Sequence, residues 1–272
     1  MNPRALAAWS GAALVIALAT GNPAYRLLVA AAALALLART ARPGAPIKRL
    51  LAALAILVVV SGTLNLFLAH LGAHVVASLP DWLPGIGGPL TVEAFVGGMA
   101  AGLGLAAAVL AVAPLTLSQD PQELVDALPE ALNRTGSALA ASFNVVPAIA
   151  RSFTAVREAQ LLRGWRPRGP RSLGEIVVPV VLTAIEDSIQ LAESMEARAF
   201  GSGPRTAYFR SRWTRRDVVT VAAAATALAV FAAARLAGAV ADWDPYPSLQ
   251  APAVDVVPVA AVLLLLVPVA RR

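Results

Sequence analysis

The sequence predicts an all-α protein that crosses a membrane several times and carries a cytoplasmic platform of amphipathic helices. Three observations support this fold class: 58% of the 272 residues are hydrophobic, only 14% are charged, and the mean hydropathy is +0.70. A soluble domain has about a quarter charged residues and just under half apolar ones. The apolar residues also gather in long runs, and about 20 of them make a helix that crosses a bilayer.

Six apolar runs reach or approach the length of a membrane span. They are Ala5–Gly21, Ala24–Ala38, Leu50–Ala69, Val92–Leu117, Asp217–Val240 and Ala253–Ala270. Backbone inside lipid has to satisfy its own hydrogen bonds, which leaves helices and closed barrels. Because the runs show no period-two alternation, we expect helices. The first two runs are short and are separated by Asn22 and Pro23, so they form either a tight hairpin or a partly re-entrant pair.

The basic residues predict the side of the membrane on which each loop lies. Four of them crowd residues 39–49, and more than half of the 22 Lys and Arg residues lie within 119–216, whereas the loops 70–90 and 241–252 contain none. Short cytoplasmic loops carry the excess of Lys and Arg. We therefore expect a multi-pass protein of the plasma (inner) membrane with both termini in the cytoplasm. Arg26, near the outer end of the first hairpin, is the one charge that disagrees.

These features divide the chain into three parts: residues 1–117 with about four spans, residues 118–216 with cytoplasmic helices, and residues 217–272 with about two spans. Apolar residues at spacings of three and four predict that the middle part forms amphipathic helices. We expect three of them, near residues 118–132, 137–163 and 173–200. Such helices lie against a membrane surface or brace one another, which is typical of a docking platform.

Two helix ends in the middle part carry an arginine close to chain breakers. One is Ala159-Gln160-Leu161-Leu162-Arg163-Gly164, and the other is Glu196-Ala197-Arg198-Ala199-Phe200-Gly201. They resemble the two Ala-Arg-Gly signatures of the transmembrane T component (CbiQ/EcfT-like) of energy-coupling factor (ECF) transporters. Leu162 stands where alanine is usual in the first signature, and Ala199 stands where glycine is usual in the second, while both keep the arginine.

Two further segments carry the same resemblance. Thr116-Leu117-Ser118-Gln119-Asp120-Pro121 followed by Leu124 is similar to the first coupling segment of that family, and Asn2-Pro3-Arg4-Ala5 is similar to its N-terminal Asp-Pro-Arg. The resemblance thus identifies the middle part as a set of coupling helices.

The resemblance implies a subunit without catalysis of its own. It would couple two cytoplasmic ABC-type ATPases to a substrate-binding membrane subunit, the S component, for uptake of a vitamin or a transition-metal ion. ATP would be bound by the ATPases, so this chain is expected to hold no cofactor, no metal and no nucleic acid. The implied ATPase-docking residues are Arg163, Gly164, Ala197, Arg198 and Ala199, supported by Ala159, Gln160, Glu196, Pro121 and Leu124.

Physical chemistry allows two explanations of the arginines themselves. A guanidinium offers five fixed donors that match a carboxylate bidentately, so an arginine on a rigid helix end can fill a groove on a partner. Alternatively, arginine is favoured at any helix C-terminus by the helix dipole. The pairing of Arg163 with Arg198 in similar surroundings favours docking.

Two smaller motifs each have two interpretations. His70 and His74 are spaced like metal ligands, with Asp81 and Glu93 as further candidates, but two histidines at the membrane interface are the simpler interpretation. The pair Gly98-x-x-x-Gly102 gives a smooth helix face, which packs either against a partner helix or inside the protein.

Two other classes of function are weighed against coupling. A channel or secondary transporter usually places ionisable groups in mid-membrane, and here only Arg235 lies well inside an expected span. A membrane-embedded enzyme would need paired carboxylates, a Ser–His pair or a His–metal site, which the spans do not supply. The sequence also contains no cysteine and no Gly-x-x-x-x-Gly-Lys-Ser/Thr phosphate loop.

Overall fold

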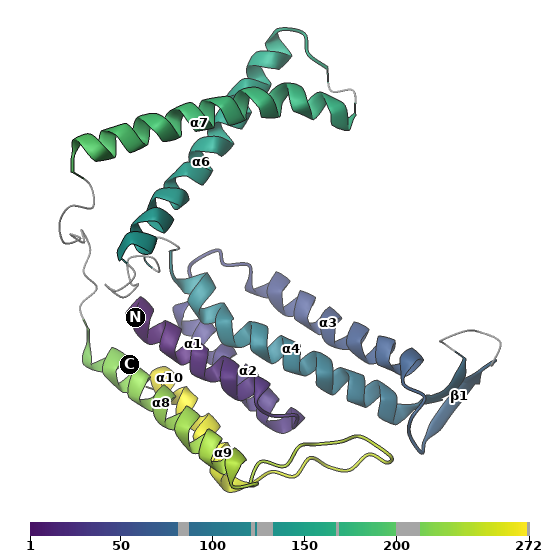
Figure 1. Cartoon of the computed structure of the whole chain (residues 1–272). Helices are drawn as coiled ribbons and strands as arrows, with labels where there is room; N and C mark the ends of the chain where they lie inside the picture. The colour runs from purple at the N-terminus through teal and green to yellow at the C-terminus, as the bar shows by residue number, and fades with distance from the viewer. Residues whose placement is uncertain (81–86, 121–122, 124–132, 167–168, 200–212, 271–272) are drawn as a thin grey trace. The chain divides into compact units, whose positions relative to one another are not determined.

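The computed structural model of the whole chain describes residues 1–80, 87–120, 123, 133–166, 169–199 and 213–270 (Figure 1). The chain forms two compact units. The first, here named the membrane unit, comprises Met1–Asp120 and Arg212–Arg272, and the second, the inserted unit, comprises Pro121–Ser211.

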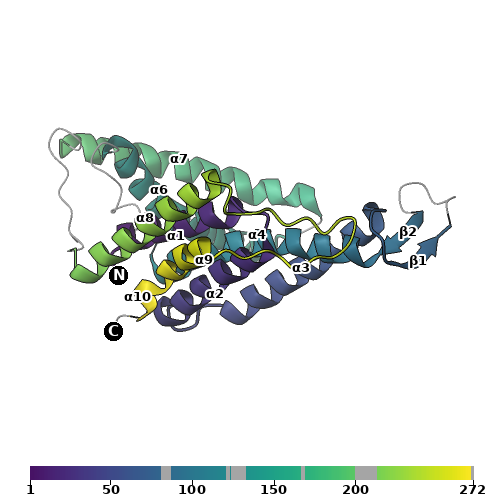
Figure 2. The same cartoon turned by 90° about the horizontal axis from the view of Figure 1, so that it is seen from below.

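The membrane unit is a bundle of helices that lie side by side (Figures 1 and 2). Its elements are α1 (Pro3–Leu18), α2 (Pro23–Thr40), α3 (Ile47–Leu68), β1 (Val75–Leu79), β2 (Gly88–Thr91), α4 (Val92–Ser118), α8 (Arg215–Leu236), α9 (Val256–Leu263), the 3₁₀ turn η3 (Leu264–Leu266) and α10 (Val267–Ala270). Among the described residues, α2, α3, α4 and α8 are long and apolar enough to cross a membrane. The predicted all-α polytopic membrane fold is confirmed.

Two of the six expected spans are short helices. α1 has 16 residues, so it rises only about 24 Å at roughly 1.5 Å per residue, against a bilayer core of about 30 Å. The last apolar run is divided by η3, where the indole Nε1 of Trp9 donates to the carbonyl of Leu265 at 3.0 Å. α1 packs on α4 and α8 and buries Leu6, Trp9 and Ile16 completely. The short first helix therefore lies within the bundle core.

Asparagine and proline begin the first two helices. The side-chain oxygen of Asn2 accepts the N–H of Arg4 at 3.0 Å, and that of Asn22 accepts the N–H of Ala24 at 2.9 Å. Each asparagine is followed by a proline at the first helical position, where the missing N–H costs nothing. Asn22 and Pro23 thus make a tight turn between two complete helices.

The two charges that disturbed the sequence pattern are both bonded at helix ends. Arg26, in the first turn of α2, donates to the carbonyl of Ala100 on α4 at 2.8 Å, and Gly104 leaves room for its guanidinium. Arg235 lies in the last turn of α8 and pairs with Asp242 at 2.6 Å. Arg26 thus has a hydrogen-bond partner and Arg235 an ion-pair partner, and both lie at helix ends instead of in the middle of a helix.

Glycines bring α3 and α4 into close contact. A Cβ atom on Gly98 would lie 2.6 Å from the carbonyl oxygen of Ser61, and one on Gly102 would lie 2.9 Å from the Cα of Val58. The hydroxyl of Ser61 also donates to the carbonyl of Gly98 at 2.8 Å. The Gly98-x-x-x-Gly102 pair is thus used for packing inside the protein, which decides between its two interpretations.

A two-stranded hairpin beyond α3 is absent from the sequence prediction. β1 and β2 pair antiparallel, with Ser78 opposite Pro89 and Leu79 opposite Gly88. Gly88 has a φ of +137°, and a Cβ atom there would lie 3.0 Å from the ring of His70. Strands of five and four residues that contain Ala, Ser, Gly and Pro give no strong alternating pattern, which explains why they escaped prediction.

The inserted unit contains α6 (Asn133–Leu162), the 3₁₀ turn η2 (Pro170–Leu173) and α7 (Gly174–Ala197). α6 and α7 contact one another and lie at about the positions of the second and third helices expected in the middle part. The first expected helix, near 118–132, lies outside the described residues apart from its first three positions and Glu123, as do Pro121 and Leu124.

The first testable prediction concerns the glycine contact. Gly98→Ala should lower the free energy of unfolding by about 1–3 kcal/mol, because overpacking a tight contact forces backbone to move. Gly11→Ala is the control, since a Cβ atom at Gly11 meets nothing within 4 Å. The measurement is the thermal unfolding midpoint of the purified protein in detergent. Equal shifts for the two variants would contradict the packing described here.

Candidate docking site at two helix ends

The end of α6 places Arg163 directly after the last helical residue. Its N–H still donates to the carbonyl of Ala159 at 3.1 Å. Beyond it, the N–H of Gly164 bonds Leu161 at 3.0 Å and the N–H of Trp165 bonds the carbonyl of Gln160 at 2.9 Å. Together with the φ of +82° at Gly164, these bonds form a Schellman motif, which closes a helix with a left-handed residue.

The end of α7 also has a left-handed residue directly after its arginine, but here that residue is alanine. Arg198 follows the last helical residue, Ala197, and its N–H donates to the carbonyl of Met195 at 3.2 Å. The N–H of Ala199 bonds the carbonyl of Glu196 at 2.9 Å, and Ala199 has a φ of +53°. Alanine here adopts the left-handed conformation that glycine adopts at Gly164, which disfavours an L-residue by about 1–2 kcal/mol.

The two arginines therefore occupy equivalent positions. Each is the residue that joins a helix to its left-handed terminator, and each is exposed. Within the described part of the chain, the guanidinium groups of Arg163 and Arg198 make no hydrogen bond and no ion pair. The guanidinium groups at the ends of these two contacting helices are consequently available to donate hydrogen bonds to a partner.

The supporting residues act mainly through their backbone. Gln160 and Glu196 supply carbonyls that accept the closing bonds of the two helix ends, and the carbonyl of Ala159 accepts the N–H of Arg163. Ala159, Ala197 and Glu196 are exposed.

Trp165 is a site residue that the sequence analysis missed. It follows Gly164, and its indole N–H is buried without a hydrogen-bond partner in the described structure. An apolar residue just after a left-handed terminator commonly packs on the last turn of the helix. The Gly-Trp dipeptide was the signal that could have identified it.

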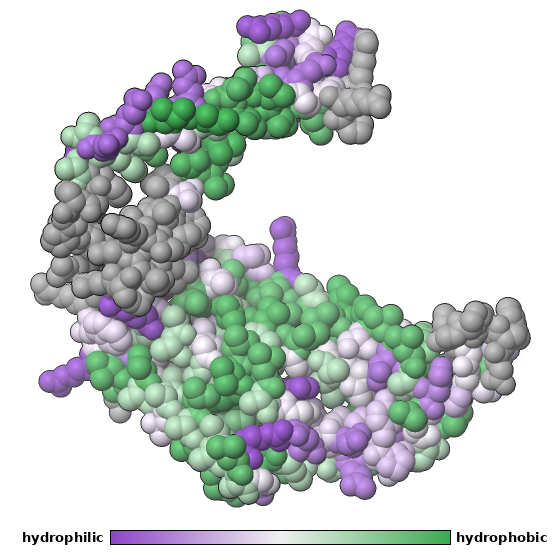
Figure 3. Space-filling view, viewed as in Figure 1, coloured by the Kyte–Doolittle hydropathy of each residue, from purple (hydrophilic) through white to green (hydrophobic). Residues whose placement is uncertain are grey.

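The apolar sides of α6 and α7 are largely open. On α7 only Ile176 and Val180 are buried, whereas several large apolar residues are between 44% and 62% exposed: Val177, Val178, Val181, Leu182, Ile185 and Ile189. Figure 3 shows this apolar surface in green. The predicted amphipathic character of α7 is thus present, and the two helices do not cover each other's apolar faces.

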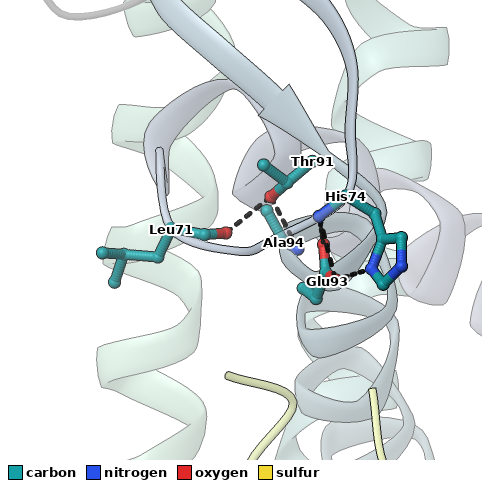
Figure 4. Close-up of polar contacts among 5 residues, drawn as sticks. All are labelled: Leu71, His74, Thr91, Glu93 and Ala94. Atoms are coloured by element: carbon teal, nitrogen blue, oxygen red, sulfur yellow. Dashed lines mark hydrogen bonds and ion pairs between the residues drawn. The ribbon is translucent and has the colours of Figure 1, made fainter. Parts of the chain in front are cut away.

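The histidine pair belongs to a different part of the chain. α3 ends at Leu68, so His70 and His74 lie beyond the helix. Nδ1 of His74 lies 2.5 Å from Oε1 of Glu93, whose side chain is completely buried, and the backbone N–H of His74 also donates to this carboxylate at 3.2 Å. Figure 4 shows these contacts.

A neighbouring threonine completes this polar group. Thr91 caps α4 by accepting the N–H of Ala94 at 3.3 Å, and its hydroxyl donates to the carbonyl of Leu71 at 2.5 Å (Figure 4). The described residues contain no group of three side chains that could hold a metal, and Asp81 lies outside them. The contacts instead hold the start of the hairpin against α4.

The comparison with known families decides the class of the protein. Residues 1–208 match the family CbiQ, described as cobalt transport protein. The chain belongs to the CbiQ family. This is the family of T components of ECF transporters, as the resemblance implied, and this member is accordingly a membrane component of a transport system. None of the curated proteins that were compared matches the chain. The CbiQ match covers the helices that carry both arginines and ends before α8.

A second testable prediction follows from the left-handed alanine. Ala199→Gly should stabilise the end of α7 by about 1 kcal/mol, because glycine adopts positive φ without steric cost. Gly164→Ala should destabilise the end of α6 by a similar amount. The measurement is hydrogen exchange of the Ala199 and Gly164 amides, which close the two helices. Faster exchange at position 199 in the glycine variant would contradict this account.

Proposed function

We propose that this CbiQ-family chain is the coupling subunit of an ECF-type importer, which links two cytoplasmic ATPases to a substrate-binding S component. The observation that carries the proposal is the equivalent placement of Arg163 and Arg198 at the ends of two contacting helices. Two similar ends suit two similar partners. The substrate would be a transition-metal ion or a vitamin, and it would be selected by the S component.

The geometry of each helix end supports docking. The closing backbone bonds keep the last turn rigid, so little conformational entropy is lost when a partner immobilises the arginine. The guanidinium is exposed before the partner binds, and a carboxylate in a partner groove would receive two parallel N–H bonds. Docking residues are thus Arg163 and Arg198, with Gly164, Ala197 and Ala199 shaping the ends.

The open apolar faces of α6 and α7 suit the other partner. An apolar face of this size is stabilised by a bilayer or by an apolar membrane protein. In the proposed mechanism, ATP-driven closure of the ATPases moves the two arginines relative to each other. α6 and α7 then act as levers that tilt the S component. The described residues offer no comparable support for an autonomous channel, since Arg235 is paired at a helix end.

The third testable prediction concerns the arginines. Arg163→Glu and Arg198→Glu should each weaken ATPase docking by roughly thirty- to several-thousand-fold, because losing one partner of a desolvated charge pair costs about 2–5 kcal/mol. The double variant should lose transport. The measurement is the amount of ATPase that co-purifies with this chain from membranes. If the arginines only complement the helix dipoles, worth about 0.3–1 kcal/mol, docking should be nearly normal.

Two controls sharpen this experiment. Arg157→Glu makes the same charge change at an exposed position of α6 away from the helix end, and it should leave docking intact. Arg163→Lys and Arg198→Lys keep the positive charge but lose the bidentate geometry of the guanidinium. They should therefore dock better than the glutamate variants but less well than the unaltered chain. Reduced amounts of the glutamate variants in the membrane, with docking intact, would contradict the proposal.

The fourth testable prediction concerns orientation. The chain has no cysteine, so single cysteines can be labelled specifically. Ser78→Cys, exposed on β1, should react with an impermeant maleimide from outside the cell, whereas Ser188→Cys, exposed on α7, should react only after the membrane is opened. Labelling of Ser188→Cys from outside would refute a cytoplasmic platform.

A further inference from the structure

The inserted unit is joined covalently to the membrane unit at two crossings, and the membrane unit fixes its own side of each crossing with polar side chains. The chain leaves after Asp120 and returns at Arg212. Two groups of hydrogen bonds lie next to these points, one at the end of α4 and one at the start of α8. They are named here the exit joint and the return joint.

The exit joint ties the end of α4 to the end of α2. The hydroxyl of Ser118 donates to that of Thr40 at 2.9 Å, and the N–H of Arg42 donates to the carbonyl of Leu117 at 3.4 Å. The guanidinium of Arg42 then forms an ion pair with Asp120, the last residue before the crossing. The hydrogen bond from Arg42 lowers the pKa of Asp120, so this carboxylate stays ionised near neutral pH.

The return joint ties the start of α8 to the start of α1. Asp217 is 2% exposed, and its Oδ1 accepts the backbone N–H of Asn2 at 2.9 Å. Its Oδ2 accepts the backbone N–H of Thr214 at 2.9 Å and the hydroxyl of Thr214 at 2.6 Å. The buried carboxylate of Asp217 thus joins the start of α8 to Asn2, the residue that caps α1.

A covalent crossing alone transmits movement poorly. Each residue has two soft backbone dihedrals. A single connecting segment of chain therefore rotates about its own bonds instead of transmitting a bend or a twist. Side-chain bonds that fix Asp120 and Thr214 remove this freedom on the membrane-unit side of each crossing. Ser118 and Asp120 are bonded to residues at the end of α2, and Asp217, which also holds Thr214, is bonded to Asn2 at the start of α1. The membrane-unit side of each crossing is therefore braced by a second helix.

We propose that the exit and return joints are positioning sites for coupling: they pass movement of α6 and α7 on to α4 and α8. Asp120 and Asp217 are the residues on which the joints depend. This inference rests on the proposed coupling function and adds the route by which the membrane unit receives the movement.

The opposite end of the membrane unit supplies a matched control. There, Oδ2 of Asp242 accepts Nη2 of Arg235 at 2.6 Å, and its Oδ1 accepts the N–H of Gly21 at 3.0 Å. The Arg235–Asp242 side chains are 36% and 56% exposed, close to the 42% and 52% of Arg42 and Asp120. The two ion pairs therefore resemble each other in chemistry and exposure, but Asp242 lies away from both crossings.

The experiment uses the complex of this chain with its ATPases in lipid vesicles and measures two spin-label distances. One label pair, Val146→Cys with Ile189→Cys, reports on α6 and α7, and the other, Leu105→Cys with Val218→Cys, reports on α4 and α8. All four positions are exposed. With ATP, both distances should change in the otherwise unaltered protein. In Asp120→Asn with Asp217→Asn, the α6–α7 change should persist and the α4–α8 change should be lost.

The controls separate coupling from stability. Asp242→Asn should keep both distance changes, and exchanging the charges of the exit joint (Arg42→Asp with Asp120→Arg) should restore the α4–α8 change relative to Asp120→Asn alone. If Asp217→Asn does not reach the membrane, the test rests on Asp120→Asn alone, because the side chain of Asp120 is exposed. An α4–α8 change that survives in the joint variants, or that is lost equally in Asp242→Asn, overturns the inference. If the unaltered chain retains no ATPases, the proposed function itself fails.

Discussion

The left-handed residue that ends α6 and α7 is the constraint on which the candidate docking site depends. It follows the arginine directly and ends each helix there, so that the backbone itself places the guanidinium at the rim of the last turn. Gly164 adopts this conformation freely, whereas Ala199 adopts it against its steric preference. The departure from the Ala-Arg-Gly signature at Ala199 therefore affects stability, while the shape that presents Arg198 is retained.

Much of the membrane unit could be predicted because lipid leaves the backbone few choices. Five of the six apolar runs became single helices and the last became two short helices joined by η3. Asn22 with Pro23 marked a turn that local capping chemistry already specifies. The helix end at Gly164 was predictable for the same local reason. The helix near 118–132, with Pro121 and Leu124, stays a prediction. For the candidate site, the sequence thus indicated which residues end the helices, and the structure adds their shared backbone geometry.

The features that escaped prediction depend on partners distant in the sequence. The hairpin is held by strand pairing and by the contact of His74 with Glu93, 19 residues away. The sequence likewise could not decide what Gly98 packs against, because a smooth helix face does not identify its neighbour. The structure supplies Ser61 and Gly62 on α3 as that neighbour. The adjacent small residues on α3 were the available signal, since close helix contacts need small residues on both sides.

Helices in lipid gain little from hiding apolar surface, because lipid is as apolar as leucine, so close packing and polar bonds set their arrangement. In this chain the close packing joins α3 to α4 through Gly98 and Gly102, and many of the polar bonds lie at the two ends of the bundle. Under the proposed function, force applied to α6 and α7 would enter the bundle covalently through the two crossings at one end. The bonds of Asp242 hold the other end. Under the same proposal, a bundle braced at both ends would tilt or bend as a body instead of letting one helix slide, which is what a lever requires.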